Sequence, residues 1–267
     1  MSRTVIEKRA AFRALHAKGC FVIPNPWDVG SARMLQHLGF PALASTSAGF
    51  AWTKGHADNH VTRDDVLHHL AQLSNGVDVP INADFENGFA TSPEDVSTNV
   101  RLAIETGVAG LSIEDAEGGV LYERGHAVER IRAARKAIDH ASEDVILVAR
   151  TERLLYEPTA VTAAIDTLVA LAEAGADCLF APGVTRPEDI AAMVRAVAPK
   201  PLNVVMFRPG LGVAALTDLG VRRISVGGAI ARVAWAAAIA TAEEILGGSF
   251  EGLGKGQTSK QLNEMFA

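Results

Sequence analysis

The chain has 267 residues, of which 48% are hydrophobic and 21% charged, and its formal net charge is −6. This composition is typical of a globular protein with a large buried core, and it excludes disordered and fibrous classes. The arginines are scattered and the net charge is negative, so the basic surface that a nucleic-acid partner requires is missing. The sequence shows neither a signal peptide nor an apolar run of membrane length, and we expect a cytoplasmic protein with no membrane partner.

Eight short apolar segments recur along the chain, with stretches of helical periodicity between them. They begin at Cys20, Ala42, Pro80, Gly110, Val145, Cys178, Leu202 and Arg223. Strands that are apolar throughout and alternate with amphipathic helices are typical of a parallel sheet covered by helices. An open doubly wound sheet would have a glycine-rich turn after its first strand, whereas this chain has Pro24-Asn25-Pro26. The pattern therefore predicts an α/β fold of the (β/α)8 TIM barrel type.

Capping signals mark the helices between these strands. Ser92-Pro93-Glu94-Asp95 predicts a helix that begins with Ser92 as its cap, and Gly107 predicts the end of that helix. Thr185 and Glu188 predict another helix start of the same kind.

The domain organisation follows from the unbroken alternation of strands and helices. Because no linker rich in Pro, Gly or Ser interrupts it, residues 1–267 are predicted to form one barrel domain. Residues 1–246 would be the barrel with its N-terminal helix. Residues 247–267 would be a weakly helical C-terminal tail that packs on a neighbouring subunit.

Acidic side chains gather where the predicted strands end, which is the face that carries function in such barrels. Asp84 and Glu86 end the third strand, and alternation along a strand would point both into the barrel mouth. Glu114 ends the fourth strand, and Asp58 lies in the loop after the second. Converging carboxylates without Cys or His favour Mg²⁺, with Mn²⁺ as a second choice. These four residues are the predicted metal ligands, and the alternative is that they are helix caps and surface charges.

Two further elements suit an anionic substrate. The small residues of the Ser45-Thr46-Ser47-Ala48 turn offer amides and hydroxyls that can bind a carboxylate. Arg150, at the end of the fifth strand, has a rigid fork of donors for the same group. The alternative for Arg150 is a structural ion pair with Glu152 or Glu114. Gly227-Gly228 resembles a phosphate turn, but with only two glycines we interpret it as a packing feature.

The segments STSAGFAW, GHAD, NADFENGFA, GLSIEDAEGG, VARTE and RRISVGGA, in this order, resemble the isocitrate lyase and phosphoenolpyruvate mutase superfamily. The resemblance spans nearly the whole chain. It implies a Mg²⁺ ion held by Asp84. It also implies that Asp58, Glu86 and Glu114 assist mainly through bound water.

The same resemblance implies a 2-oxo acid substrate whose carboxylate rests on the Ser45–Ala48 turn and on Arg150. The reaction would pass through a pyruvate-like enolate, and Arg150, Glu114 and Asp58 are the residues expected to take part in catalysis. Members also exchange their last barrel helix between subunits, which implies a homodimer or homotetramer with a swapped C-terminal helix.

The loop after the fourth predicted strand departs from the superfamily pattern. Residues 117–126 read EGGVLYERGH, without the Lys-Lys/Arg-Cys-Gly-His sequence of the lyases or the Lys-Thr-Asn element of the phosphonate enzymes. Tyr122, Glu123, Arg124 and His126 are the only loop candidates for proton transfer, and His126 can equally start the next helix.

The sequence therefore predicts a Mg²⁺-dependent carbon–carbon lyase for a small 2-oxo or 2-hydroxy acid, either an oxaloacetate decarboxylase or a methylisocitrate-lyase-like enzyme. Decarboxylation fits the reduced loop, because polarisation of the keto group by the metal drives loss of CO₂ with little acid–base help. Two alternatives stay open. One is a P–C bond enzyme similar to phosphonopyruvate hydrolase or phosphoenolpyruvate mutase, and the other is a catalytically silent 2-oxo-acid binding protein.

Overall fold

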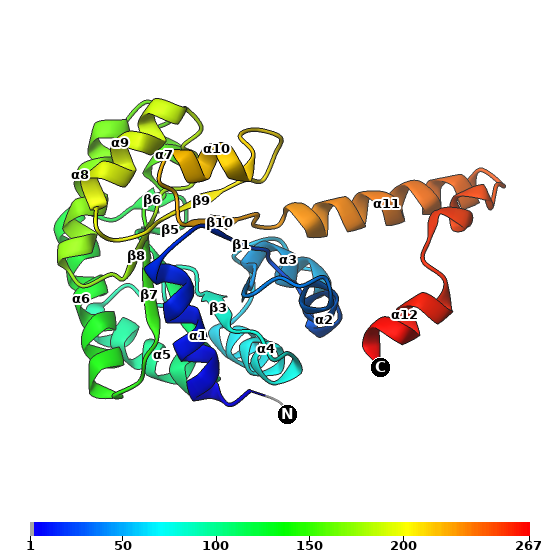
Figure 1. The fold of residues 1–267 in the computed structure, drawn as a ribbon, viewed down its shortest axis with the longest axis horizontal. Coiled ribbons are helices and arrows are strands. Elements are labelled where there is room, and N and C mark those ends of the chain that lie inside the picture. Colours follow the sequence, from blue (N-terminus) through cyan, green and yellow to red (C-terminus); the bar gives the residue numbers. More distant parts are fainter. Residues whose placement is uncertain (1–2) are drawn as a thin grey trace.

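Eight parallel strands form the central sheet of the computed structural model, which describes residues 3–267 (Figure 1). They are β1 (Phe21–Ile23), β2 (Leu43–Ala44), β3 (Ile81–Asp84), β4 (Gly110–Glu114), β7 (Ile146–Arg150), β8 (Cys178–Phe180), β9 (Leu202–Val205) and β10 (Arg223–Ser225). Their order, β1-β10-β9-β8-β7-β4-β3-β2, leaves β1 and β2 at the two edges. There the amide of Ala44 donates to the carbonyl of Pro24 at 3.0 Å, so the edges approach closure. The predicted TIM-like barrel is confirmed; Met1 and Ser2, part of the predicted domain, lie outside the described residues.

Helices surround the sheet, and most of them follow a strand (Figure 1). They are α1 (Val5–Ala17), α2 (Val29–His37), α3 (Ser47–Thr53), α4 (Arg63–Gly76), α5 (Pro93–Glu105), α6 (Arg124–His140), α7 (Arg153–Tyr156), α8 (Val161–Glu173), α9 (Pro187–Val197), α10 (Val213–Asp218), α11 (Ala229–Leu246), the 3₁₀ helix η1 (Glu251–Lys255) and α12 (Ser259–Phe266). A small hairpin of β5 (Ala116–Glu117) and β6 (Val120–Leu121) follows β4.

One of the two predicted helix starts is confirmed and the other is wrong. Ser92 caps α5, because its hydroxyl oxygen accepts from the amide of Asp95 at 3.1 Å. Thr185 does not cap α9, since Arg186 occupies the cap position and makes no side-chain cap. Pro187 is the first residue of α9, where its fixed φ and missing N–H suit the helix, so the helix starts later than the Thr185 signal indicated.

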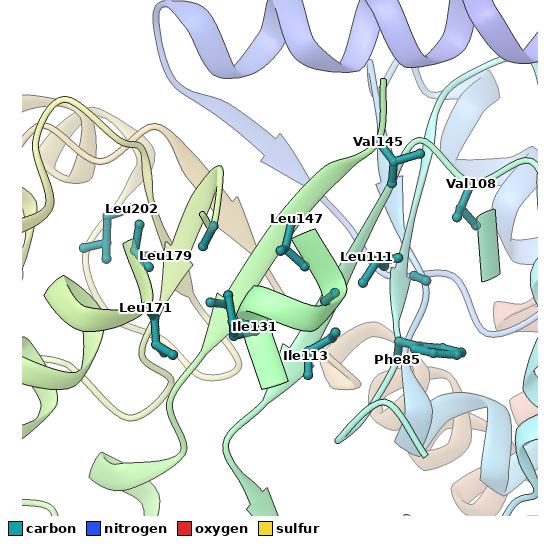
Figure 2. Close-up of a cluster of buried hydrophobic side chains, with 14 of the residues drawn as sticks. Phe85, Val108, Leu111, Ile113, Ile131, Val145, Leu147, Leu171, Leu179 and Leu202 are labelled. Atoms are coloured by element: carbon teal, nitrogen blue, oxygen red, sulfur yellow. The ribbon is translucent and has the colours of Figure 1, made fainter. Parts of the chain in front are cut away.

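Side chains alternate strictly between the two faces of the barrel wall. On β7, Leu147 and Ala149 belong to the core between strands and helices, whereas Ile146 and Val148 belong to the core inside the barrel. Figure 2 shows the outer core, in which Leu147 lies near Ile131 of α6. This period of two sends every second side chain at a strand's carboxyl end into the barrel mouth.

Helix α1 closes the opposite, amino-terminal end of the barrel. Its Phe12 is fully buried inside the barrel, and a Cβ at Gly110 would lie 2.7 Å from the Phe12 ring. The Phe12 carbonyl accepts from Nδ1 of His16 at 2.8 Å, which leaves Nε2 of His16 as the acceptor facing Nη1 of Arg223 at 3.4 Å. His16 is therefore neutral, and burial, followed by the charge of Arg223, lowers its pKa to about 3.

Helix α11 projects from the barrel over most of its length (Figure 1). Ala231, in the first turn of α11, is buried, but Val233, Ile239 and Leu246 are 70%, 53% and 89% exposed. Beyond α11 the chain turns back and α12 lies beside α2 (Figure 1). The predicted division into a barrel of residues 1–246 and a tail of residues 247–267 that packs on a neighbouring subunit stays a prediction. The predicted exchange of this helix between subunits stays a prediction.

No helix among residues 3–267 is long and apolar enough to cross a membrane, and this includes α11. The cytoplasmic location stays a prediction.

The buried neutral His16 predicts a loss of stability in mild acid. Its ordinary pKa of 6.5 applies to the unfolded chain, so below pH 6.5 the unfolded chain takes up a proton that the folded protein refuses until about pH 3. We expect His16 to lower the free energy of unfolding by about 1.4 kcal/mol per pH unit in this window, or about 2 kcal/mol at pH 5. Urea unfolding of the wild type and His16→Phe at pH 7, 6 and 5 measures this slope. Equal slopes in the two proteins would contradict the prediction.

Candidate functional site

A cavity of about 390 Å³ opens at the carboxyl ends of the strands. Its wall includes the whole Ser45–Ala48 turn together with Asp58, Asp84 and Arg150. The apolar part of the wall contains Trp52, Leu155, Phe180 and Phe207. This size suits a small molecule, and the mixture of an apolar wall with a few polar groups is typical of ligand sites.

The Ser45–Ala48 turn is held directly on Asp84. The hydroxyl oxygen of Ser45 accepts from the amide of Asp84 at 2.8 Å, and the amide of Ser47 donates to the Asp84 carboxylate at 3.0 Å. Thr46 caps α3 through the amide of Gly49, where a Cβ would lie 2.6 Å from the Thr46 methyl group. The turn therefore orients Asp84, and its binding of a substrate carboxylate stays a prediction.

The four predicted metal ligands lie around two adjacent cavities. Asp84 lines the 390 Å³ cavity, Glu86 and Glu114 line a neighbouring one of about 440 Å³, and Asp58 lines both. Strand alternation, from which we predicted that Asp84 and Glu86 point to one side, does not reach Glu86. Strand β3 ends at Asp84, and Glu86 has a left-handed φ of 47° that turns its side chain toward the second cavity.

Burial and mutual repulsion disfavour charge on these carboxyl groups. Burial and then the charges of Asp84 and Asp58 raise the pKa of Glu86 to about 8. Burial and then Asp84 raise the pKa of Asp58. One carboxyl oxygen of Glu86, Oε1, is buried without a hydrogen-bond partner.

These residues fit a divalent cation in their chemistry, although they are not assembled into a finished site. Within residues 3–267, no three His, Cys, Asp or Glu side chains are grouped closely enough to hold a metal ion. The donors are nonetheless carboxylates alone, the preference of Mg²⁺ and Mn²⁺, and the unpaired Glu86 oxygen lacks the partner that a cation would supply. Asp84, Asp58, Glu86 and Glu114 are the residues that would hold such an ion.

Arg150 forms the structural ion pairs that we considered as its alternative role. Its Nη1 lies 2.9 Å from Glu114 and 3.6 Å from Asp84, and its Nε and Nη2 donate to Glu152. Burial opposes its charge, but these carboxylates more than offset burial and raise the pKa of Arg150 above its usual value. Burial also raises the pKa of Glu114, while Arg150 acts in the opposite sense. Arg150 lines the cavity as predicted, yet its donors are already engaged.

The structure adds two site residues that the sequence reasoning missed. Asn25 joins three strand ends, because its side-chain amide donates to the carbonyl of Ser45 at 2.9 Å and its oxygen accepts from the amides of Val226 and Gly227. Its signal was its place directly after the first strand. Arg232 lines the cavity from the first turn of α11, and within residues 3–267 it makes no ion pair or side-chain hydrogen bond. It lies outside every motif, so the sequence carried no signal for it.

None of the loop candidates for proton transfer, Tyr122, Glu123, Arg124 and His126, lines the 390 Å³ cavity. The Tyr122 hydroxyl donates to Glu117 at 2.9 Å. His126 lies in the first turn of α6, and its Nε2 contacts the Thr91 carbonyl at 2.9 Å. The interpretation of His126 as part of the next helix is confirmed.

Comparison with known proteins identifies the family. A family model described as phosphoenolpyruvate phosphomutase matches residues 12–246. The chain belongs to the phosphoenolpyruvate mutase/isocitrate lyase superfamily. Members of this superfamily are lyases, hydrolases and mutases that act on small acids.

Individual proteins are similar to most or nearly all of the chain. A crystal structure of a putative lyase/mutase from Burkholderia cenocepacia J2315 is 44% identical with a TM-score of 0.95, over 98% of this chain and 97% of that one. The crystal structure of 2,3-dimethylmalate lyase is 28% identical with a TM-score of 0.86, over 99% and 95% of the two chains. An uncharacterized protein of Mycobacterium tuberculosis (strain ATCC 25618 / H37Rv) is 32% identical over 81% of both chains.

Proposed function

We propose that this protein is a Mg²⁺-dependent carbon–carbon lyase that acts on a small 2-oxo or 2-hydroxy acid and releases a 2-oxo acid. The observation that carries the proposal is the gathering of four carboxyl side chains around two adjacent cavities, of about 390 Å³ and about 440 Å³, at the carboxyl ends of the strands. The similarity to 2,3-dimethylmalate lyase supports a lyase among the activities of the superfamily.

The residues of the chain supply charge and position in this proposal. When bound, a divalent cation would polarise the keto oxygen and stabilise the negative charge that develops on it. The Ser45 and Ser47 contacts orient the Asp84 carboxylate toward the cavity. The Arg150 guanidinium lies 2.9 Å from Glu114 and opposes the effect of burial on its pKa, which favours the ionised carboxylate that a cation needs as a ligand.

None of the four loop candidates for proton transfer lines the 390 Å³ cavity, which favours decarboxylation over the retro-aldol reaction within this proposal. Tyr122 and His126 lie outside the cavity wall and bond to Glu117 and to Thr91. Loss of CO₂ from a 2-oxo acid such as oxaloacetate needs little proton transfer from the protein.

The first test is a substrate panel with and without Mg²⁺. Oxaloacetate, 2-methylisocitrate, isocitrate, 2-methylmalate and phosphonopyruvate are mixed with the purified protein, and released 2-oxo acid and phosphate are followed in parallel. We expect Mg²⁺-dependent release of a 2-oxo acid without phosphate, and at least about a hundredfold lower turnover in Asp84→Asn. Asp218→Asn, an exposed change on α10, is the matched control and should keep full activity.

Three outcomes of the panel would redirect the proposal. Phosphate release would identify a P–C bond enzyme. Tight binding of 2-oxo acids without turnover would identify a binding protein. Full activity of a folded Asp84→Asn would show that Asp84 holds no catalytic cation.

Within this proposal, Arg232 binds a second acid group of the substrate. It is the one arginine on the cavity wall, among residues 3–267, whose charge is not already engaged by carboxylates. The backbone at the start of α11 is anchored, because the buried Ala231 beside Arg232 packs close to Gly49 and a Cβ at Gly228 would touch the Trp52 ring at 3.3 Å. A guanidinium that faces a cavity suits a carboxylate.

Replacing Arg232 tests this role in steady-state kinetics. Arg232→Met should raise the KM for a diacid about tenfold to a hundredfold, the value of a charge-assisted hydrogen bond, and leave kcat nearly unchanged. Arg232→Lys should recover part of the loss. The control is Arg195→Met on α9, an exposed arginine away from the cavity. An unchanged KM in Arg232→Met would remove this residue from substrate binding.

We also propose that the protein is a homodimer or homotetramer held together through α11. This helix leaves several large apolar side chains in solvent, a feature that marks an interaction surface. Val233→Glu and Ile239→Glu each replace one of these apolar side chains with a charged one. Glu243→Gln, an exposed change on the same helix that leaves the apolar side chains intact, is the control. Sedimentation velocity should show an oligomer for the wild type and Glu243→Gln, and monomers for the two charged variants. A monomeric wild type would contradict the proposal.

A further inference from the structure

Arg130 is a buried arginine with an unusual set of partners. It lies on α6, is 1% exposed, and within residues 3–267 forms no ion pair with a carboxylate. Its Nη1 donates to the carbonyl of Glu114 at 2.9 Å. Its Nη2 donates to the carbonyls of Asn87 and of Ala90, the latter at 2.8 Å. A full charge is thus buried to bind backbone oxygens alone, where an apolar side chain would fill the space without the desolvation penalty.

The carbonyls that Arg130 binds belong to the two segments that carry candidate metal ligands. Glu114 is itself a candidate ligand at the end of β4, and Asn87 directly follows Glu86. The segment around Asn87 is strained, because both Glu86 (φ 47°) and Phe89 (φ 53°) have left-handed backbone. Such conformations persist only where surrounding contacts impose them.

A second set of contacts encloses Arg130 from the solvent side. Its guanidinium lies over the Tyr122 ring, 4.3 Å from the ring centre. The Tyr122 hydroxyl accepts from the side-chain amide of Asn87 at 3.2 Å and donates to Glu117, which also accepts from Thr91 at 2.8 Å. The β5–β6 hairpin is therefore fastened to the same segment that Arg130 holds from inside.

We propose that Arg130 is a positioning residue that holds the Glu86 segment and the end of β4 at the separation needed to bind a divalent cation. The planar guanidinium reaches three carbonyls on two segments, and a lysine ammonium, a single point donor, does not reproduce that geometry. The inference rests on the cation of the proposed function. It adds that cation affinity depends on a residue that touches neither the cation nor the substrate.

The test measures cation affinity directly, without substrate. Mn²⁺ is titrated into the full-length protein, and free Mn²⁺ is followed by electron paramagnetic resonance for the wild type, Arg130→Met, Arg130→Lys and Arg132→Met. Loss of a group that supports a ligand from outside weakens metal binding 10- to 100-fold. We expect an increase of about tenfold or more in the Mn²⁺ Kd of Arg130→Met and a smaller one in Arg130→Lys. Arg132→Met, an exposed α6 arginine paired with Glu129, should match the wild type.

Circular dichroism at the titration temperature separates positioning from simple support of the fold. A folded Arg130→Met with wild-type Mn²⁺ affinity would overturn the proposal, since a residue that only stabilises the fold would lower the unfolding temperature alone. Should Arg130→Met fail to fold, Arg130→Lys decides, because wild-type affinity in that folded variant also overturns the proposal. A wild type that binds Mn²⁺ but converts no acid would contradict the proposed reaction. In that case the Mn²⁺ affinity of the Arg130 variants still decides this inference. A wild type that binds no Mn²⁺ overturns both.

Discussion

The charge of Arg150 allows acidic side chains to converge inside the barrel mouth. Parallel register places Arg150 directly beside Glu114, and its guanidinium also meets Asp84 and Glu152. Without the positive charge of Arg150, the buried carboxylates would repel one another, and such repulsion favours their protonated forms. The compensation is incomplete, because Glu86 and Asp58 still have raised pKa values. In the proposed function, a divalent cation would offset the remaining repulsion among these carboxyl groups.

The cavity carries charges of opposite sign on different walls. Carboxylates lie on one wall, and the Arg232 guanidinium, which has no carboxylate partner among residues 3–267, lies on another. Asp84 and Asp58 belong to the β3 end and the loop after β2, whereas Arg232 belongs to the start of α11 after β10. In the proposed function, a divalent cation held by the carboxylates would bind the reacting keto acid, and Arg232 would bind the second acid group of the substrate. The cavity wall also contains apolar side chains, among them Trp52 and Phe180.

The sequence predicted what depends on strand period, and it failed where tertiary contacts decide. Alternation along β3 and β7 was enough to send Asp84 and Arg150 into the mouth, because period two is a property of any strand. Glu86 escaped this reasoning, since its left-handed backbone begins where the strand ends. The three carbonyls that Arg130 binds are distant in the sequence and carry no local signal. The same is true of Arg232, whose place on the cavity wall depends on how α11 leaves the barrel.

In the proposed oligomer, helix α11 would link assembly to the site, because the same helix would serve both. Its first turn carries Arg232 on the cavity wall and packs through Ala231 near Gly49, while its later turns expose Val233 and Ile239. A helix transmits orientation along its length, since each turn is hydrogen-bonded to the next. A neighbouring subunit that covers these exposed side chains would therefore fix the axis of α11 and, with it, the direction in which Arg232 extends. Without that subunit, Arg232 would lie at the base of a helix whose later turns have no packing partner. Substrate binding by Arg232 should accordingly be tighter in the assembled protein than in a monomer.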